Sequence, residues 1–308
     1  MSGARAIRIA ICGTGSFGTT RAKALDGIEG AKVVLGWSRS EASRARFTRE
    51  TGAPTVKRWE DLCASDQADA VFVCTPNAEH FSHALAALEA RKHVLVETPL
   101  SLSYADARQL ADRAERSRLV LHHGAKWRHH PDHGRYITQF RRVGSLLFAI
   151  DHAAFDFGPE RGWYRDRKLT GGARAFLPYV MVQWLEAFGN VTAAVGAEST
   201  ADEWDAASLT LSFAAGGHAT ISYALGLGIP ERPVREVCGT EGIITTCPDG
   251  KTVFVRGEEQ SVIERRPVDI VACECRAFLD EVRGVRDHRP DLSLDLRALE
   301  LVDQAFCR

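Results

Sequence analysis

The stretch AIRIAICGTGSFG, residues 6–18, decides the fold of the first part of the chain. It begins with a run of β-branched and apolar residues, which predicts a buried strand. It ends in a Gly-x-Gly-x-x-Gly turn, with its glycines at Gly13, Gly15 and Gly18. The first glycine permits a tight turn, the second lets backbone N–H groups approach a pyrophosphate, and the third lets the following helix pack on the strand. The pattern predicts a dinucleotide site with Ser16 and Phe17 at the N-terminus of a helix, where unpaired N–H groups favour negative charge.

Strand and helix patterns continue to alternate up to residue 123. Further strands are expected at 31–37, 70–74, 93–97 and 119–122, and helices at 41–50, 78–90 and 104–117. Short apolar strands separated by helices predict a parallel sheet with both faces covered. The first domain is therefore expected to be a Rossmann domain at residues 1–123.

Beyond residue 123 the pattern changes to runs of alternating polarity punctuated by glycine turns. These runs predict a largely antiparallel sheet, with strands at 145–153, 207–213, 218–225, 235–239 and 252–256. Two closing helices are expected at 272–285 and 295–307, the second containing Cys307. The fold class is α/β, and residues 124–308 form a substrate-binding and oligomerisation domain with an open sheet. The C-terminal helix is expected to pack back on the first domain.

The composition excludes several classes of protein. The 308 residues carry 39 basic and 40 acidic side chains, for a net charge of −1, which gives no electrostatic footprint for nucleic acid or an anionic membrane. No apolar run approaches the roughly 18–20 residues that a membrane helix needs, and the N-terminus carries no secretory segment. The eight cysteines are scattered and are expected to be reduced thiols. The sequence indicates a cytoplasmic protein acting on a small molecule.

The end of the second predicted strand indicates which dinucleotide binds. NAD sites usually carry an acidic residue about 20 positions after the glycines, where it bonds the adenosine ribose. Here that stretch reads GWSRS at residues 36–40 and has no carboxylate. Arg39, with Ser38, Ser40 and Arg44 nearby, could pair with a 2′-phosphate through charge-assisted hydrogen bonds. The alternative is that the two arginines only solvate a helix start. NADP(H) is favoured over NAD(H).

Two further segments are more specific: CTPNAEH at residues 74–80 and KHVLVETPL at residues 92–100. Together with the glycine turn they resemble the glucose–fructose oxidoreductase/inositol dehydrogenase family (Gfo/Idh/MocA), and the likeness extends over nearly the whole chain. The resemblance implies a Rossmann domain, an α/β domain with an open sheet, a nicotinamide cofactor and a homo-oligomer, dimer or tetramer, packed through that sheet.

The resemblance also implies roles for individual residues. Thr75 and Pro76 should line the nicotinamide, and Glu97, followed by Thr98, should bond the nicotinamide ribose. His80 begins a helix in the family pattern, although a surface position on that helix is the alternative. Pro99 would turn the chain out of the strand.

The departures from the family pattern bear directly on the chemistry. Thr98 replaces the lysine that resembles a proton donor in the sugar dehydrogenases, and Leu177 and Met181 stand where such enzymes place an Asp and a His. Alcohol oxidation needs a base within hydrogen-bond reach of the hydroxyl. The layout resembles the biliverdin-reductase-like branch, which also replaces the lysine. However, Val180 and Gln183 stand in place of that branch's arginines.

Other residues could replace the missing groups. Lys126, Tyr179 and His152 are candidate proton donors. A core position is the alternative for Tyr179, and only one of Asp151 and His152 can face a cleft, because alternate residues of a strand face opposite sides. Candidate substrate-binding residues are Trp127, Arg128 and Arg174. No metal is predicted: His129 and His133 are four residues apart, but a proline lies between them and no acidic or cysteine partner has metal spacing.

Hydride delivery to an already activated acceptor needs less acid assistance than ketone reduction. The sequence therefore favours an NADPH-dependent reductase of a small imine or a conjugated C=C or C=N substrate, as part of specialised metabolism. The first alternative is a sugar or polyol dehydrogenase with a different proton donor. The second is a non-catalytic NADP(H)-binding sensor or partner subunit, because the usual catalytic set is absent.

Overall fold

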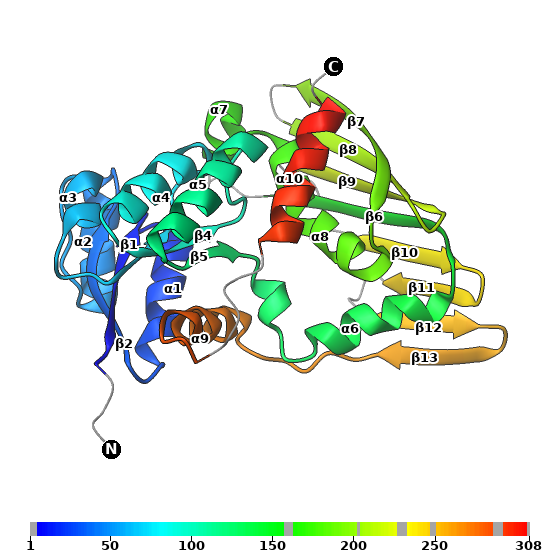
Figure 1. Cartoon of the computed structure of the whole chain (residues 1–308), viewed down its shortest axis with the longest axis horizontal. Coiled ribbons are helices and arrows are strands. Elements are labelled where there is room, and N and C mark those ends of the chain that lie inside the picture. The colour runs from blue at the N-terminus through cyan, green and yellow to red at the C-terminus, as the bar shows by residue number, and fades with distance from the viewer. Residues whose placement is uncertain are drawn as a thin grey trace. The chain divides into compact units, whose positions relative to one another are not determined.

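The computed structural model describes residues 5–156, 163–201, 204–226, 233–246, 251–285 and 292–306. The chain divides into two compact units (Figure 1). Unit 1 comprises Met1–His130 and Val268–Leu292, and unit 2 comprises Pro131–Pro267 and Ser293–Arg308. The division after His130 lies later in the chain than the predicted boundary at residue 123. Residues 268–292 return to unit 1, whereas the last helix belongs to unit 2.

Unit 1 is built on a five-stranded parallel sheet in the order β2-β1-β3-β4-β5. Its strands are β1 (Ile7–Cys12), β2 (Ala31–Trp37), β3 (Ala70–Val73), β4 (His93–Glu97) and β5 (Leu121–Gly124). The longer helices are α1 (Ser16–Asp26), α2 (Glu41–Thr51), α3 (Trp59–Ala64), α4 (His80–Glu89), α5 (Tyr104–Ser117) and α9 (Ile270–Val282). Two 3₁₀ turns, η1 (Asn77–Glu79) and η2 (Lys126–His129), follow β3 and β5. This is the predicted Rossmann sheet.

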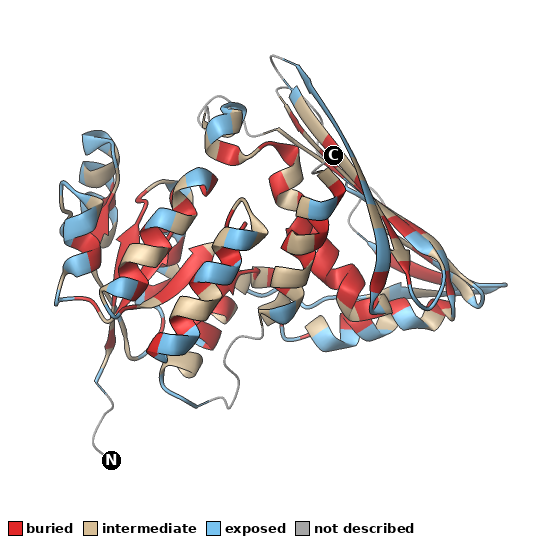
Figure 2. Cartoon of the chain, turned by 45° about the horizontal axis from the view of Figure 1, so that its top comes forward, coloured by how far each residue is buried: buried red, intermediate tan, exposed pale blue. Residues whose placement is uncertain are grey.

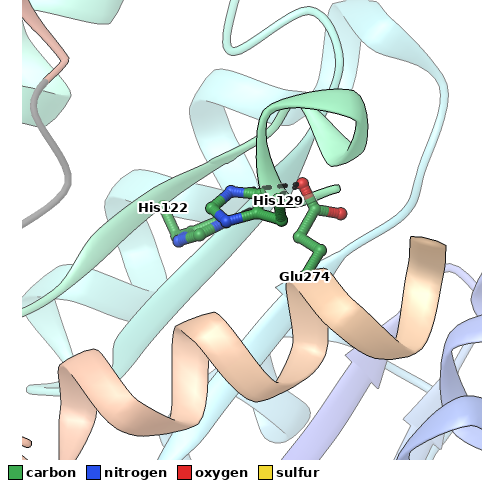
Figure 3. Close-up of side chains that lie close together, drawn as sticks. All are labelled: His122, His129 and Glu274. Carbon is green, nitrogen blue, oxygen red and sulfur yellow. Dashed lines mark ion pairs between the residues drawn. The ribbon is translucent and has the colours of Figure 1, made fainter. Parts of the chain in front are cut away.

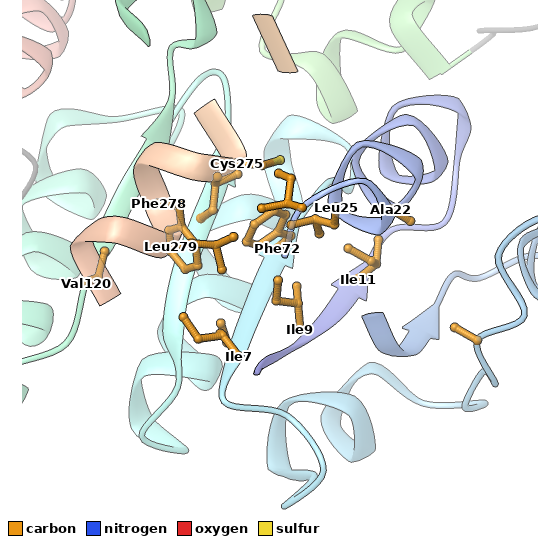
Figure 4. Packing of buried hydrophobic residues seen from close by; sticks show 14 of the residues in the cluster. Ile7, Ile9, Ile11, Ala22, Leu25, Phe72, Val120, Cys275, Phe278 and Leu279 are labelled. Atoms are coloured by element: carbon orange, nitrogen blue, oxygen red, sulfur yellow. The ribbon is translucent and has the colours of Figure 1, made fainter. Parts of the chain in front are cut away.

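The core of unit 1 needs α9 for its completion. Figure 4 shows apolar side chains of β1 and α1 packed against Phe72 of β3 and against α9. Phe278 of α9 is fully buried, and its ring meets Phe72 edge-on with the centroids 5.0 Å apart. The helix begins where Asp269 caps it by accepting a hydrogen bond from the N–H of Ala272, a residue type and geometry that stabilise helix starts. A segment from late in the sequence thus covers one face of the N-terminal sheet.

Unit 2 contains an eight-stranded sheet in the order β13-β12-β11-β10-β6-β9-β8-β7, in which only β6 and β9 pair in parallel. The strands are β6 (Leu146–Asp156), β7 (Val191–Ala201), β8 (Trp204–Phe213), β9 (His218–Gly226), β10 (Val234–Gly239), β11 (Gly242–Thr246), β12 (Thr252–Arg256) and β13 (Glu259–Ile263). The longer helices are α6 (His133–Phe140), α8 (Leu177–Phe188) and α10 (Ser293–Phe306). This confirms the predicted α/β domain with a largely antiparallel sheet.

Among the described residues, helices cover one face of this sheet and no helix covers the other, which is called the open face below. α8 packs on β8 and β9, and α10 packs on α8 and β7. Most residues of α8 are buried, as its largely red ribbon in Figure 2 shows. The opposite face carries the exposed Val195 and His152 and hydroxyl pairs such as Ser208–Ser222. None of the helices among the described residues has both the length and the apolar character needed to cross a membrane.

Several elements were not anticipated. α3, β7, β11 and β13 had no predicted counterpart, and β5 begins two residues later than expected, at Leu121 rather than Leu119. β5 contains His122 and His123, and both are buried. The polarity of these two histidines led to a predicted strand end at residue 122, two residues before the observed end. Residue Cys307, expected in the closing helix, lies outside the described residues.

Candidate functional site: the glycine turn and the strand ends of unit 1

The three glycines of the turn occupy three different environments. Gly13 has φ +104°, and a Cβ there would lie 2.5 Å from the carbonyl carbon of Cys74. A Cβ on Gly18 would lie 2.0 Å from the carbonyl oxygen of Gly13, so only glycine lets α1 approach the strand end. A Cβ on Gly15 would meet nothing within 4 Å. The turn is therefore crowded on both sides and open only above Gly15, where a pyrophosphate would approach.

The N-terminus of α1 is left without a side-chain cap. Gly15 occupies the cap position and its backbone is extended, whereas Ser40 and Ser103 cap α2 and α5 with their hydroxyls. The first N–H groups of a helix have no partner within the helix, and together with the helix dipole they favour an anion. Ser16 is exposed beside this end, and Phe17 is half-buried. The residues present thus fit the pyrophosphate of a dinucleotide.

The loop after β2 holds one arginine in a position to reach an adenosine ribose. Arg39 is exposed, and its Nη1 lies 3.3 Å from Oε1 of Glu79. Arg44 donates from Nη1 to the carbonyl oxygens of Ser38 and Arg39, at 2.6 and 3.1 Å. Arg44 therefore braces the loop in this structure, and Arg39 is the arginine that remains at its surface.

Glu79 was missed by sequence reasoning, although it lies in the same TPNAEH motif that suggested the family. Its Oε1 faces Arg39, while its Oε2 is buried without a hydrogen-bond partner. Burial raises the pKa of Glu79, and the Arg39 charge opposes that rise. A carboxylate beside the predicted 2′-phosphate position bears on cofactor preference.

The loops after β3 and β4 are held together by a buried histidine. His80 is fully buried, with Nδ1 2.7 Å from the carbonyl oxygen of Pro99 and Nε2 2.9 Å from that of Thr75. The Thr98–Pro99 peptide bond is cis. His80 thus supports the backbone of the two loops, and it lies inside the fold rather than on a helix surface.

Thr75 and Pro76 differ in exposure. Thr75 is buried, and its Oγ1 lies 3.1 Å from Nδ1 of His83, whereas Pro76 is half-buried. His83 packs against the rings of Trp37 and Trp59. Burial lowers the pKa of His83 to about 4, so the ring is neutral at pH 7. His83 is a second residue of this motif that sequence reasoning missed.

Glu97, at the end of β4, is held by an arginine that the sequence did not single out. Arg21 of α1 is completely buried and donates from Nε to Oε1 of Glu97 at 2.6 Å. The same guanidinium forms an ion pair with Glu274 of α9. Burial raises the pKa of Glu97, and Arg21 opposes this rise. The chain therefore fixes the Glu97 carboxylate with a cation from another element.

A histidine extends this buried network. Nδ1 of His122, in β5, lies 2.8 Å from Oε2 of Glu281, and its Nε2 lies 3.8 Å from Oε1 of Glu274. Burial alone would lower the pKa of His122, but the two carboxylates raise it to about 9. Burial likewise opposes ionisation of Glu274, but Arg21 and His122 hold its pKa well below the usual range. The network joins α1, β4, β5 and α9.

Lys126 is the candidate proton donor that the structure brings to the glycine turn. Its Nζ lies 4.8 Å from the centroid of the Phe17 ring. Its charge also lowers the pKa of Glu97, which places it within electrostatic reach of that carboxylate. Beside it, Thr98 contacts Nε2 of His123 through its hydroxyl at 3.2 Å. Lys126, Glu97, Thr98 and the glycine turn therefore gather at the carboxyl ends of β1, β4 and β5, the edge where such sheets bind ligands.

The remaining predicted residues are dispersed. Trp127 is buried and Arg128 is half-buried, both in η2. In unit 2, Tyr179 is half-buried on α8, and Arg174 is half-buried in the short 3₁₀ turn Ala173–Phe176. His152 is exposed and aligned with Ser222 on the open face of the sheet, whereas α8 covers the other face. His152 and Tyr179 are thus not brought together.

The two apolar residues expected at the positions of the family's Asp and His are part of the core. Leu177 and Met181 are both fully buried, so these two positions hold no acid or base.

On the helix-covered face, Asp151 accepts from Arg235 at 2.7 Å and from Nε1 of Trp184 at 3.3 Å. This buried ion pair was not predicted, because the two residues are 84 positions apart.

Comparison with known proteins agrees with this geometry. Residues 7–125 match the family model GFO_IDH_MocA, described as "Oxidoreductase family, NAD-binding Rossmann fold". Over residues 7–125 the chain is similar to the Gfo/Idh/MocA oxidoreductase family. This agrees with the family resemblance of the TPNAEH and ETP motifs.

Curated oxidoreductases resemble part of this chain. One is a 4-carboxy-2-hydroxymuconate-6-semialdehyde dehydrogenase of Sphingobium sp., 35% identical over 141 residues, and another is a 1,5-anhydro-D-fructose reductase of Ensifer adhaerens, 32% identical over 147 residues. Each match covers 46% of this chain and 44% of the relative. The alignment therefore spans about half the length of either protein.

Solved structures resemble this protein over nearly the whole chain. Biliverdin reductase from Synechocystis, in complex with biliverdin and NADP+, has a TM-score of 0.87 at 24% identity and covers 97% of this chain and 98% of its own. A 3-ketoreductase from Actinomadura kijaniata, in complex with NADP and TDP-benzene, has a TM-score of 0.81 at 22% identity, covering 97% and 96%. At these identities the likeness shows the fold.

Proposed function

We propose that the protein is an NADPH-dependent reductase that transfers hydride to a small imine or to a conjugated C=C or C=N substrate. One inference from the resemblance carries this proposal: by motif position, Thr98, Leu177 and Met181 replace the lysine, aspartate and histidine of the sugar dehydrogenases. Leu177 and Met181 are fully buried in the structure. An iminium carries its positive charge before hydride arrives, and a conjugated acceptor spreads the incoming negative charge. Such substrates need less acid and base assistance than an alcohol or a ketone.

Lys126 is the residue that we propose as proton donor. When bound, a reduced nicotinamide supplies a hydride. In the reduction of a neutral imine the carbon gains that hydride, and the nitrogen gains a proton from Nζ of Lys126, so that an amine is released. The position of Lys126 beside Phe17 and near Glu97 supports this role.

Replacing Lys126 with methionine is expected to lower kcat by about 10²–10⁴-fold, the usual contribution of a positioned acid or base. The measurement is NADPH oxidation with a cyclic imine, at a pH above the pKa of its iminium. Lys57→Met, which changes an exposed lysine of the same unit, should retain wild-type turnover. Equal kcat values for wild type and Lys126→Met would remove Lys126 from the proposal.

A sugar or polyol dehydrogenase with a non-standard proton donor is the second candidate, because one relative is a 1,5-anhydro-D-fructose reductase. Assays with NADP+ and a panel of aldoses and cyclitols separate the two. Robust oxidation of those substrates at neutral pH would replace the imine proposal. Tight NADPH binding with turnover of neither class would favour a non-catalytic NADP(H)-binding protein.

We propose NADP(H) as the preferred cofactor, with Arg39 as the residue that pairs with the 2′-phosphate. Arg39→Ala is expected to raise the Kd of NADPH roughly 10- to 100-fold, as loss of a charge-assisted hydrogen bond does, and to leave the Kd of NADH within about twofold. Tryptophan fluorescence quenching measures both constants. Arg58→Ala, which removes another exposed arginine of unit 1 paired with a glutamate, is the control.

A substitution of Glu79 provides a second test of this cofactor proposal. Because its carboxylate competes with a phosphate for Arg39, Glu79→Gln should tighten NADPH binding and leave NADH binding unchanged or weaker. An unaltered ratio of the two constants in both Arg39→Ala and Glu79→Gln would contradict the assignment of the 2′-phosphate to this loop.

We further propose that two copies of the chain associate through the open face of the unit 2 sheet. Val234, Ile243, Val255 and Val262 are exposed there, with Ile243 and Val255 directly paired across β11 and β12. Contiguous exposed apolar side chains mark interaction surfaces. Val255→Asp is expected to shift the sedimenting species to the monomer, whereas Val285→Asp, at a 70% exposed position of unit 1, should not. A monomeric wild type would refute the proposal.

A further inference from the structure

Three side chains from separate elements of unit 1 converge on one point. His122 comes from β5, His129 from η2 and Glu274 from α9 (Figure 3). One ligand atom from each lies within 4.8 Å of the other two. Nε2 of His122 and Nε2 of His129 lie 3.8 and 4.0 Å from the same oxygen, Oε1 of Glu274. Ligand atoms bound at about 2.0–2.2 Å to one tetrahedral ion are separated by about 3.3–3.6 Å, so small side-chain movements would close the site.

Two of the three converging atoms, from His122 and Glu274, are buried and lack hydrogen bonds. His122 and Glu274 are at most 1% exposed, and neither Nε2 of His122 nor Oε1 of Glu274 has a hydrogen-bond partner. A buried polar atom left in this state costs about 1–3 kcal/mol. Their 3.8 Å separation is too long for a hydrogen bond. An ion between them would satisfy both.

The surroundings have the form of a second coordination shell. Nδ1 of His122 lies 2.8 Å from Oε2 of Glu281. In the ion-bound state Nδ1–H would donate to this carboxylate, and the lone pair of Nε2 would face Glu274. A carboxylate behind a histidine in this way is a recurrent feature of zinc sites. Arg21 occupies the other oxygen of Glu274, so the carboxylate is fixed in orientation. Cys275, the next residue, faces Arg21 at 3.8 Å and is not part of the set.

The charges of this network favour a divalent cation. Glu97, Glu274 and Glu281 are each at most 13% exposed. Arg21, which is fully buried, forms ion pairs with Glu97 and Glu274. An ion bound at Nε2 takes the place of any proton there, so both imidazoles are neutral in the bound state and the three glutamates with Arg21 carry a net charge of −2. Two nitrogens and one carboxylate oxygen suit zinc-type ions, whereas magnesium and calcium prefer sets of oxygens.

We propose that His122, His129 and Glu274 bind one transition-metal ion of the zinc class, with Glu281 positioning His122. The ion touches neither substrate nor cofactor. It clamps the returning helix α9 onto β5 and η2, the turn that carries Lys126.

The test uses the full-length protein, stripped with a chelator and kept reduced, and titrates it with Co²⁺ alone. Wild type should bind one Co²⁺ per chain with the visible absorption of a four- or five-coordinate ion, and Zn²⁺ should displace it. His129→Gln should weaken binding at least about 100-fold, and Glu281→Gln about 10- to 100-fold. His133→Gln, four residues from His129 and paired with Glu186 in unit 2, should bind like wild type.

His129 is partly exposed, so its variant is expected to fold, and melting curves in chelator check this. If His122→Gln or Glu274→Gln does not fold, the His129 and His133 variants still decide the question. Absence of stoichiometric Co²⁺ binding by wild type would overturn the proposal. So would an intense thiolate charge-transfer band, which would place the ion on cysteines, or equal affinities of wild type and His129→Gln.

Discussion

Replacing Arg21 with methionine is expected to lower the free energy of unfolding by about 3–5 kcal/mol, the cost of removing one partner from a buried ion pair. Arg21 is fully buried between Glu97 and Glu274, and methionine keeps most of its unbranched stem without its charge. The two carboxylates would then remain buried without their cation. Urea unfolding in the presence of a chelator, followed by tryptophan fluorescence, measures the change.

Lys23 provides the matched control, because it lies on the same helix and also pairs with a glutamate. Its ion pair with Glu50 is exposed, with the Lys23 side chain 57% accessible, and such pairs contribute about 0–1 kcal/mol. Lys23→Met should therefore unfold close to wild type. Adding Glu274→Leu to Arg21→Met should recover part of the loss. A loss below 1 kcal/mol in Arg21→Met would mean that the network adds little to stability.

Gly15→Val is expected to abolish tight cofactor binding while the protein stays folded. Gly15 has φ −68°, which valine can adopt, and its Cβ would meet nothing within 4 Å. The side chain would instead fill the space through which a pyrophosphate reaches the first N–H groups of α1. The Kd of NADPH should rise about 100-fold or more, equivalent to about 2.8 kcal/mol, as measured by fluorescence titration.

Substitutions at two other glycines separate a loss of cofactor binding from a loss of stability. Gly134→Val also places a side chain in open space, on α6 of unit 2, and should leave binding intact. Gly18→Val should destabilise the protein itself, because its Cβ would collide with the carbonyl oxygen of Gly13. Wild-type affinity in Gly15→Val would show that the turn does not hold the cofactor.

The sequence predicted elements well where one periodicity dominates. The strands at 31–37 and 93–97 and the helix at 104–117 have the predicted bounds, because apolar runs and a helical stripe end there in clear turn or cap residues. β7 and β13 were missed, since most of their residues are exposed and few are large and apolar. Their pairing with neighbouring strands, rather than their own composition, makes them strands.

The residues of the candidate site also differ in how far local sequence predicts them. Gly13, Gly15 and Gly18 could be assigned because a contiguous motif carries a complete geometric meaning. Arg21 could not, because its partners Glu97 and Glu274 are far away in sequence and only the fold brings them together. His152 was a candidate because a strand end can point either way, and the structure places it on the open face. Long-range partners and strand orientation are properties of packing, which local pattern does not encode.

The return of residues 268–292 to the first unit affects how the protein is made. During synthesis, Ile9 and Phe72 leave the ribosome long before Phe278, which covers them. Nearly the whole second unit is translated in between. Until then the N-terminal sheet exposes an apolar face, the condition under which nascent chains depend on chaperones. A gene fragment ending at residue 130 would encode the sheet without the helix that covers its apolar face. A fusion or split-protein design for this Rossmann unit must therefore supply the helix at 270–282 as a second segment.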